Sequence, residues 1–298
     1  MMDRAPALPN LTQRALMWRA RLRDGAQAWR LPLTLLGAGL FIGGSWLSFR
    51  HLGVSPADLR PGPLLAQLLL TPLSLLYGGI GMTLLARGAG MHIPLRRATA
   101  QSSYATLAEI LPIPGGALVR AGALMAGGAR PAQSWALVLL AAVMWISLAA
   151  LGCGLTLIGH DAFGGPLLAL AGLAGTLASC LGLARMADWR TALLNLGHRL
   201  AGLALLAVRL QLAFLCLGVA LPLGDTLPFA LANIAGSAAS IAPAGLGISE
   251  SFAAGAAGWV AVAPAAGFLA VGLDRVILLA ASALFALATL HWRQEPAQ

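Results

Sequence analysis

The sequence predicts an all-α polytopic membrane protein with about six spanning helices and two re-entrant helical hairpins in an inverted repeat. Of its 298 residues 59% are hydrophobic and 10% charged, and the mean hydropathy is +0.82. A soluble domain carries roughly 25% charged residues, so lipid must surround most of this chain. The apolar runs are continuous rather than alternating, which argues against a β-barrel.

The N-terminal segment, residues 1–30, contains six arginines and no long apolar run. Its apolar residues at helical spacing are Leu11, Ala15, Trp18 and Leu22. This spacing predicts an amphipathic helix on the cytoplasmic membrane surface. A single transmembrane domain over 31–290 and a short cytoplasmic tail at 291–298 follow.

Eight apolar stretches divide the transmembrane domain. Six of them reach the ~20 residues that cross a bilayer, at about 31–49, 63–86, 132–158, 164–183, 200–221 and 264–290. The other two, about 98–128 and 226–262, are broken by proline and glycine into halves too short to span. We expect each to form a helical hairpin that enters and leaves on one side.

Each hairpin turn has a compact set of proline and glycine residues. They are Pro112, Pro114, Gly115 and Gly116 in the first turn, and Pro243, Gly245 and Gly247 in the second. Broken backbone facing lipid leaves polar groups unsatisfied, so both turns should be buried in protein or line a cavity.

The arginines predict the orientation. All 19 basic residues are arginines, giving a formal charge of +9. They concentrate before the first span, after the second, and between the fourth and fifth, where Arg185, Arg190 and Arg199 lie. The positive-inside rule then puts both termini in the cytoplasm. The first hairpin enters from the cytoplasm and the second from the opposite face. Because the arginines lie between apolar runs, no nucleic-acid partner is expected.

An internal repeat accompanies this pattern. A shift of 130 residues aligns Pro114–Arg120 with Ala244–Glu250. The repeating unit is span, hairpin, span, over about 63–158 and 200–290. Inverted repeats with broken helices are a recurring plan of transporters.

Six charged residues fall within the predicted membrane depth: Glu109, Arg120, Arg209, Glu250, Asp274 and Arg275. A charge near the bilayer centre costs at least ~2.5 kcal/mol, so these side chains should face the protein interior. One interpretation is a pocket in which the arginines hold a lipid phosphate and the acids hold a cationic headgroup or protons. The alternative is that the charges only neutralise one another in a scaffold.

At these residues the sequence resembles a known family. The stretch Gly245–Glu250, followed 25 residues later by Arg275, is similar to the C-terminal signature of the lysylphosphatidylglycerol synthase transmembrane region family of flippase-like membrane proteins. The stretch from Pro112 to Arg120 resembles that family's first signature, although Ala117 stands where an acidic residue is frequent. The charges frequent in the following span are replaced by the region of Met144 and Trp145.

The resemblance implies a protein that handles lipids or lipid-linked sugars, without the aminoacyltransferase domain of the family's fused members. We therefore expect a flippase-like transporter of an anionic or zwitterionic phospholipid or a polyprenyl-linked lipid. No nucleotide-binding motif, metal cluster or catalytic constellation is evident, so neither a cofactor nor an enzyme is expected. The glycine-rich spans permit a homodimer. Two alternatives stay open: a structural or assembly subunit of an envelope pathway, and a membrane-embedded lipid-phosphate enzyme.

Overall fold

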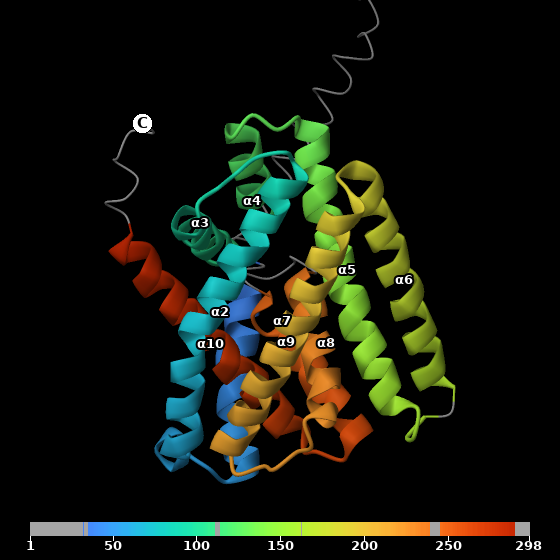
Figure 1. Cartoon of the computed structure of the whole chain (residues 1–298). Helices are drawn as coiled ribbons and strands as arrows, with labels where there is room; N and C mark the ends of the chain where they lie inside the picture. Colours follow the sequence, from blue (N-terminus) through green and yellow to red (C-terminus); the bar gives the residue numbers. More distant parts are fainter. Residues whose placement is uncertain (1–31, 33–34, 111–113, 162, 239–244, 290–298) are drawn as a thin grey trace, which may run out of the picture.

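The computed structural model describes residues 32, 35–110, 114–161, 163–238 and 245–289, and within them the chain is helical with no strand (Figure 1). A helix over 35–52 comes first. The others are η1 (Pro56–Asp58), α2 (Pro61–Gly88), α3 (Leu95–Ala108), α4 (Gly115–Ala126), α5 (Pro131–Leu157), α6 (Gly164–Met186), α7 (Trp189–Cys216), η2 (Gly224–Thr226), α8 (Leu227–Ala238), α9 (Ile248–Ala256), η4 (Ala257–Val260) and α10 (Pro264–Ala288). The predictions for 1–30, for 291–298 and for Pro112 and Pro243 fall outside the described residues.

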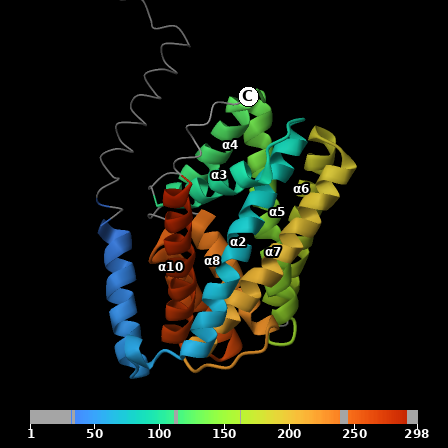
Figure 2. The ribbon, with the colours of Figure 1, turned by 60° about the vertical axis from the view of Figure 1, so that its left-hand side comes forward.

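Five described helices are long and apolar enough to cross a membrane, namely α2, α5, α6, α7 and α10. The chain is therefore a multi-span helical membrane protein. Six spans were expected. The remaining one, at about 31–49, overlaps the helix over 35–52, which is not among the five. This helix lies at the edge of the bundle beside α10 (Figure 2). Its Gly44 backbone approaches Phe268 of α10 closely, because glycine has no Cβ there.

Proline and a capping aspartate start four of the long helices. Pro61, Pro131 and Pro264 are the first residues of α2, α5 and α10. Proline suits this position because its fixed φ is helical and its missing amide proton has no partner there. Asp188 caps α7, accepting a hydrogen bond from the Thr191 amide at 2.8 Å.

The start of α7 corrects one prediction. The fifth span was expected at 200–221, with Arg199 in the preceding loop, but the helix already begins at Trp189. The cap at Asp188 starts the helix upstream of the apolar run. Arg199 is accommodated inside the helix because its side chain lines a cavity within the protein.

The two proline-glycine stretches form pairs of short helices, α3 with α4 and α8 with α9. The first pair lies at the end of the bundle where α2 ends and α5 begins (Figures 1 and 2). The second pair is joined to the long helices before and after it at the other end of the bundle, where α7 ends and α10 begins. Each pair therefore starts and finishes at one end of the bundle, and the two ends are opposite.

Two buried cores match the two sets of helices. One core contains Met82 and Leu85 of α2, Leu124 of α4, and Leu137 and Met144 of α5. The other contains Leu210 and Phe214 of α7, Phe229 of α8, and Ala266 and Val271 of α10. Each core therefore comes mainly from one set of span, short pair and span, while α2 also packs against α7 and α5 against α8.

Glycines bring α5 and α6 together. A Cβ on Gly154 or Gly172 would collide with the backbone of the facing helix, at Ala169 and Leu151 respectively. Small residues at these positions let the two backbones approach closely. These glycines therefore contribute to the packing of α5 against α6 within one chain.

Candidate functional site

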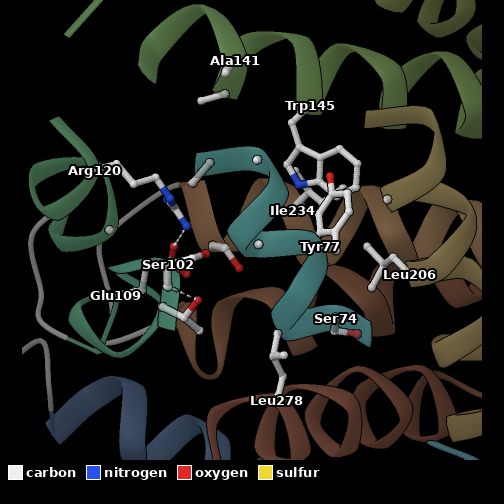
Figure 3. A pocket seen from close by; sticks show the side chains of 18 of the residues that line it. Ser74, Tyr77, Ser102, Glu109, Arg120, Ala141, Trp145, Leu206, Ile234 and Leu278 are labelled. Carbon is white, nitrogen blue, oxygen red and sulfur yellow. Dashed lines mark hydrogen bonds and ion pairs between the residues drawn. The ribbon is translucent and has the colours of Figure 1, made fainter. Parts of the chain in front are cut away.

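A cavity of about 460 Å³ lies inside the bundle and is reached by both short-helix pairs (Figure 3). Glu109, Gly116 and Arg120 line it from the first pair, and Asn233 and Ser237 line it from the second. Long helices α2, α5, α7 and α10 complete the wall. Elements from both halves of the chain therefore share one cavity, whose wall is mainly apolar with charged and polar side chains set in it.

The first pair carries an ion pair on the cavity wall. Arg120 Nη2 lies 3.3 Å from Glu109 Oε1, and the two side chains are 31% and 35% exposed (Figure 3). A Cβ at Gly116 would press against the Glu109 side chain, and one at Gly115 would collide with the Ala108 carbonyl. The predicted glycines at the start of α4 thus leave room for this pair and for the contact with α3.

A second, buried ion pair joins three long helices. Arg209 Nη2 of α7 lies 2.7 Å from Asp274 Oδ1 of α10, and the side chains are 7% and 1% exposed. Gln67 Nε2 of α2 donates to Asp274 Oδ1 at 3.1 Å, and Arg209 Nη1 donates to Ser74 Oγ at 3.1 Å. These partners offset the loss of hydration, which otherwise makes a buried ion pair costly.

The third ion pair ties α10 to the second short pair. Arg275 Nη1 lies 3.8 Å from Glu250 Oε1, with side chains 6% and 0% exposed. Arg275 Nη2 also donates to Asn233 Oδ1 at 2.6 Å, and to Ser237 Oγ and Ser249 Oγ at 2.7 Å each. One guanidinium therefore bonds to residues of both α8 and α9.

The predicted glycines of the second turn are required by the backbone. Gly245 has φ +65° and Gly247 has φ +79°, a region that residues with a Cβ rarely adopt. The Gly247 amide donates to Glu250 Oε2 at 2.7 Å, so Glu250 also caps the start of α9. This carboxylate thus fixes the turn and pairs with Arg275.

All six predicted intramembrane charges are consequently paired within the protein. Five of them line the cavity, and Glu250 lies behind Arg275. Asp274 and Arg275 are neighbours in the chain, but their ion-pair partners are Arg209 and Glu250 respectively. Among the described residues, no three His, Cys, Asp or Glu side chains gather where they could hold a metal ion.

Several polar residues that line the cavity or contact its charged residues were missed from the sequence. Arg199 was interpreted as a loop residue, and Gln67 and Ser74 of α2 were not singled out. Helical spacing carried the signal: Gln67, Thr71 and Ser74 recur on one buried face of an otherwise apolar helix. Helix α7 begins at Trp189, upstream of the apolar segment, so Arg199 lies within the helix.

Neither a family model nor a curated protein matches this chain.

Proposed function

We propose that the chain is a lipid translocase of the bacterial inner membrane that moves a phospholipid or lipid-linked headgroup through the cavity between two re-entrant helix pairs. One observation carries the proposal: short helices from opposite ends of the bundle line the same cavity, and charged side chains are part of its wall. Broken helices that meet near the bilayer midplane form the substrate sites of many transporters. The resemblance of the sequence to flippase-like membrane proteins indicates the class of substrate, a lipid.

The arrangement of the two halves supports an inverted repeat. Helices α2–α5 and α7–α10 follow the same order of long, short, short and long. Helix α2 rises in Figure 1 while α7 descends, so the two units run in opposite directions. Exchange of conformation between two such units would open the cavity alternately to each face.

The charges of the two ends support a membrane orientation. The end that holds α3 and α4 carries Arg87, Arg96, Arg97, Arg130, Arg185 and Arg190 in or beside its connections. The other end carries two arginines, Arg50 and Arg60, together with Asp58, Asp161 and Asp225. By the positive-inside rule the first end faces the cytoplasm.

The outer surface of the bundle suits the acyl chains of a lipid, and the cavity suits its headgroup. Leu167, Leu170 and Leu177 of α6 are exposed and apolar, as is expected where acyl chains contact the protein. Inside, Arg120 and Glu109 are the most exposed of the three ion pairs. Arg120 can donate further hydrogen bonds to a phosphate, because its guanidinium carries five N–H groups.

A structural or assembly subunit is the second candidate function. It is favoured by the complete internal pairing of the six intramembrane charges, since a scaffold also needs its buried charges neutralised. The two functions differ in one consequence: only a translocase changes the leaflet distribution of lipid.

The test is leaflet transfer in reconstituted vesicles. Fluorescent phosphatidylglycerol and phosphatidylethanolamine are followed by dithionite quenching, which reports only the outer leaflet. Wild-type protein should accelerate transfer above protein-free vesicles, and Arg120→Gln should slow it by roughly tenfold because a charge-assisted phosphate contact is lost. Asp225→Asn, in an outer connection, is the matched control and should retain the wild-type rate. Folded wild-type protein that transfers neither lipid would contradict the proposal.

A further inference from the structure

Four side chains from three helices gather on another part of the cavity wall: Tyr77 of α2, Trp145 of α5, and His198 and Arg199 of α7. The rings of Tyr77 and His198 are stacked, with centroids 4.0 Å apart and planes at 14°. The Tyr77 and Trp145 rings are 6.3 Å apart and lie together in Figure 3, away from Arg120 and Glu109. The Arg199 guanidinium carbon lies 5.5 Å from the centre of the Trp145 ring.

Three polar atoms of this group are buried without a hydrogen-bond partner among the described residues: Tyr77 Oη, His198 Nε2 and Arg199 Nε. Folded proteins rarely leave buried polar atoms unsatisfied, because each has lost its bonds to water. Tyr77 Oη packs against Gly202 of α7 and His198 Nε2 packs against Gly81 of α2, so these atoms bond a polar ligand in the cavity once their side chains turn toward it.

The charges of the cavity indicate the sign of that ligand. Four arginines line the wall: Arg120, Arg199, Arg209 and Arg275. Three of them pair with carboxylates of Glu109, Asp274 and Glu250. Within the described part of the chain, Arg199 has no carboxylate oxygen within 4.0 Å. The cavity therefore keeps one uncompensated positive charge, at Arg199.

We propose that Tyr77, Trp145, His198 and Arg199 form a second phosphate subsite for an anionic lipid headgroup, separate from Arg120, an inference that rests on the translocase function proposed above. The Arg199 guanidinium donates a forked pair of hydrogen bonds to phosphate oxygens, as this planar group does in many phosphate sites. The Tyr77 hydroxyl donates another. Trp145 holds the guanidinium plane by a cation–π contact. A phosphate diester carries one negative charge, which matches Arg199 as the one cavity arginine with no carboxylate partner in the part of the chain that the structure describes.

The location along α7 gives the subsite a place in the transport cycle. Arg199 is ten residues into a helix that begins at Trp189, roughly 15 Å along its axis, and Arg209 is roughly 15 Å further. The subsite is thus nearer the arginine-rich end than the buried Arg209–Asp274 pair. An anionic headgroup that arrives from the proposed cytoplasmic leaflet meets Arg199 before it reaches that pair.

The test measures binding to the purified full-length protein in detergent by isothermal titration calorimetry. The probes are short-chain phosphatidylglycerol, a short-chain diacylglycerol that lacks phosphate, and inorganic phosphate. Arg199→Gln is compared with Arg190→Gln, an exposed arginine of the same helix that does not line the cavity. We expect Arg199→Gln to bind phosphatidylglycerol at least about tenfold more weakly, Arg190→Gln to bind like wild type, and diacylglycerol not to bind.

Two further variants separate binding from folding. Tyr77→Phe removes a single hydroxyl and should weaken phosphatidylglycerol binding by roughly threefold to tenfold. Arg199→Lys keeps the charge but not the forked geometry and should restore part of the affinity. Wild-type affinity in both Arg199→Gln and Tyr77→Phe, at unchanged melting temperature, overturns the subsite. Binding of inorganic phosphate without phosphatidylglycerol overturns the assignment to a lipid.

Leaflet transfer measured on the same preparations keeps the two proposals apart. Transfer by wild type together with unchanged binding by Arg199→Gln rejects the subsite and leaves the translocase. Binding that depends on Arg199, without any transfer, rejects the translocase and leaves the subsite.

Discussion

At the scale of single residues, the Arg209–Asp274 pair is one of two ion pairs that are almost fully buried in the described part of the chain. Both side chains are nearly buried, and they connect α7 to α10 with Gln67 and Ser74 of α2 beside them. Removal of one partner leaves an uncompensated charge inside the protein, whereas removal of both leaves none. The fold therefore depends on the pair being complete more than on either residue alone.

We expect Arg209→Met to destabilise the protein by about 3–5 kcal/mol, and Arg209→Met combined with Asp274→Leu to recover most of that loss. Thermal unfolding in detergent, arranged as a double-mutant cycle, measures the coupling. Arg190→Gln, an exposed arginine of the same helix, is the control and should change the melting temperature little. A double variant as unstable as the single one would contradict the account.

The identity of the six intramembrane charges could be predicted from the sequence, because a charge in an apolar run is conspicuous. Their partners could not. Asp274 and Arg275 are adjacent, yet Asp274 pairs across to α7 and Arg275 to α9. Successive residues on a helix point about 100° apart, so chain neighbours seldom share a partner. Only the packing of α7, α9 and α10 decides which charges meet.

At the scale of elements, the start of α7 depends on one carboxylate. The Thr191 hydroxyl and then the Thr191 amide donate to Asp188, and these hydrogen bonds hold the pKa of Asp188 below its ordinary value of 3.8. A lowered folded-state pKa means that the ionised cap contributes stability above the unfolded-state value. That contribution is lost as the pH falls through the folded-state value.

Asp188→Asn should therefore be less stable than wild type near neutral pH, and the difference should shrink as the pH is lowered. The measurement is the melting temperature of both proteins between about pH 6 and pH 3. A difference that stays constant over this range would show that the charge of Asp188 contributes nothing to the cap.

Helix α4 offers a matched pair of glycines. A Cβ at Gly115 would collide with the Ala108 carbonyl of α3, whereas a Cβ at Gly122 would meet no atom within 4 Å. We expect Gly115→Ala to cost about 1–3 kcal/mol by forcing the short helices apart. Gly122→Ala should be neutral or stabilise by up to ~1 kcal/mol, since alanine favours a helix. Equal effects of the two substitutions on thermal unfolding would contradict the close α3–α4 contact.

The broken elements were predicted better than the ends of the long ones. Short halves separated by prolines and glycines predicted the α3–α4 and α8–α9 pairs, because these residues interrupt helices wherever they gather. The start of α7 was predicted too late, since the apolar run begins only after Arg199. The missed signal was Asp188 followed by Thr191, a capping arrangement that hydropathy alone does not register.

At the scale of the whole molecule, composition was sufficient to predict a multi-span helical membrane protein. It could not predict the cavity, because a cavity arises where α2, α5, α7 and α10 leave space between them. Arg199, Tyr77 and Trp145 meet only after these helices are assembled. The central claim is that both short-helix pairs border one cavity that water can enter.

Reaction with a small water-soluble thiol reagent tests that claim most directly. Ser102→Cys of α3 and Ser237→Cys of α8 line the cavity, while Leu170→Cys of α6 is on the outer apolar surface. The native cysteines Cys153, Cys180 and Cys216 are buried and give a low background. In protein embedded in vesicles, the account predicts labelling at positions 102 and 237 and none at 170, because a thiol ionises and reacts only in contact with water. Absence of labelling at 102 and 237, as at 170, would contradict it.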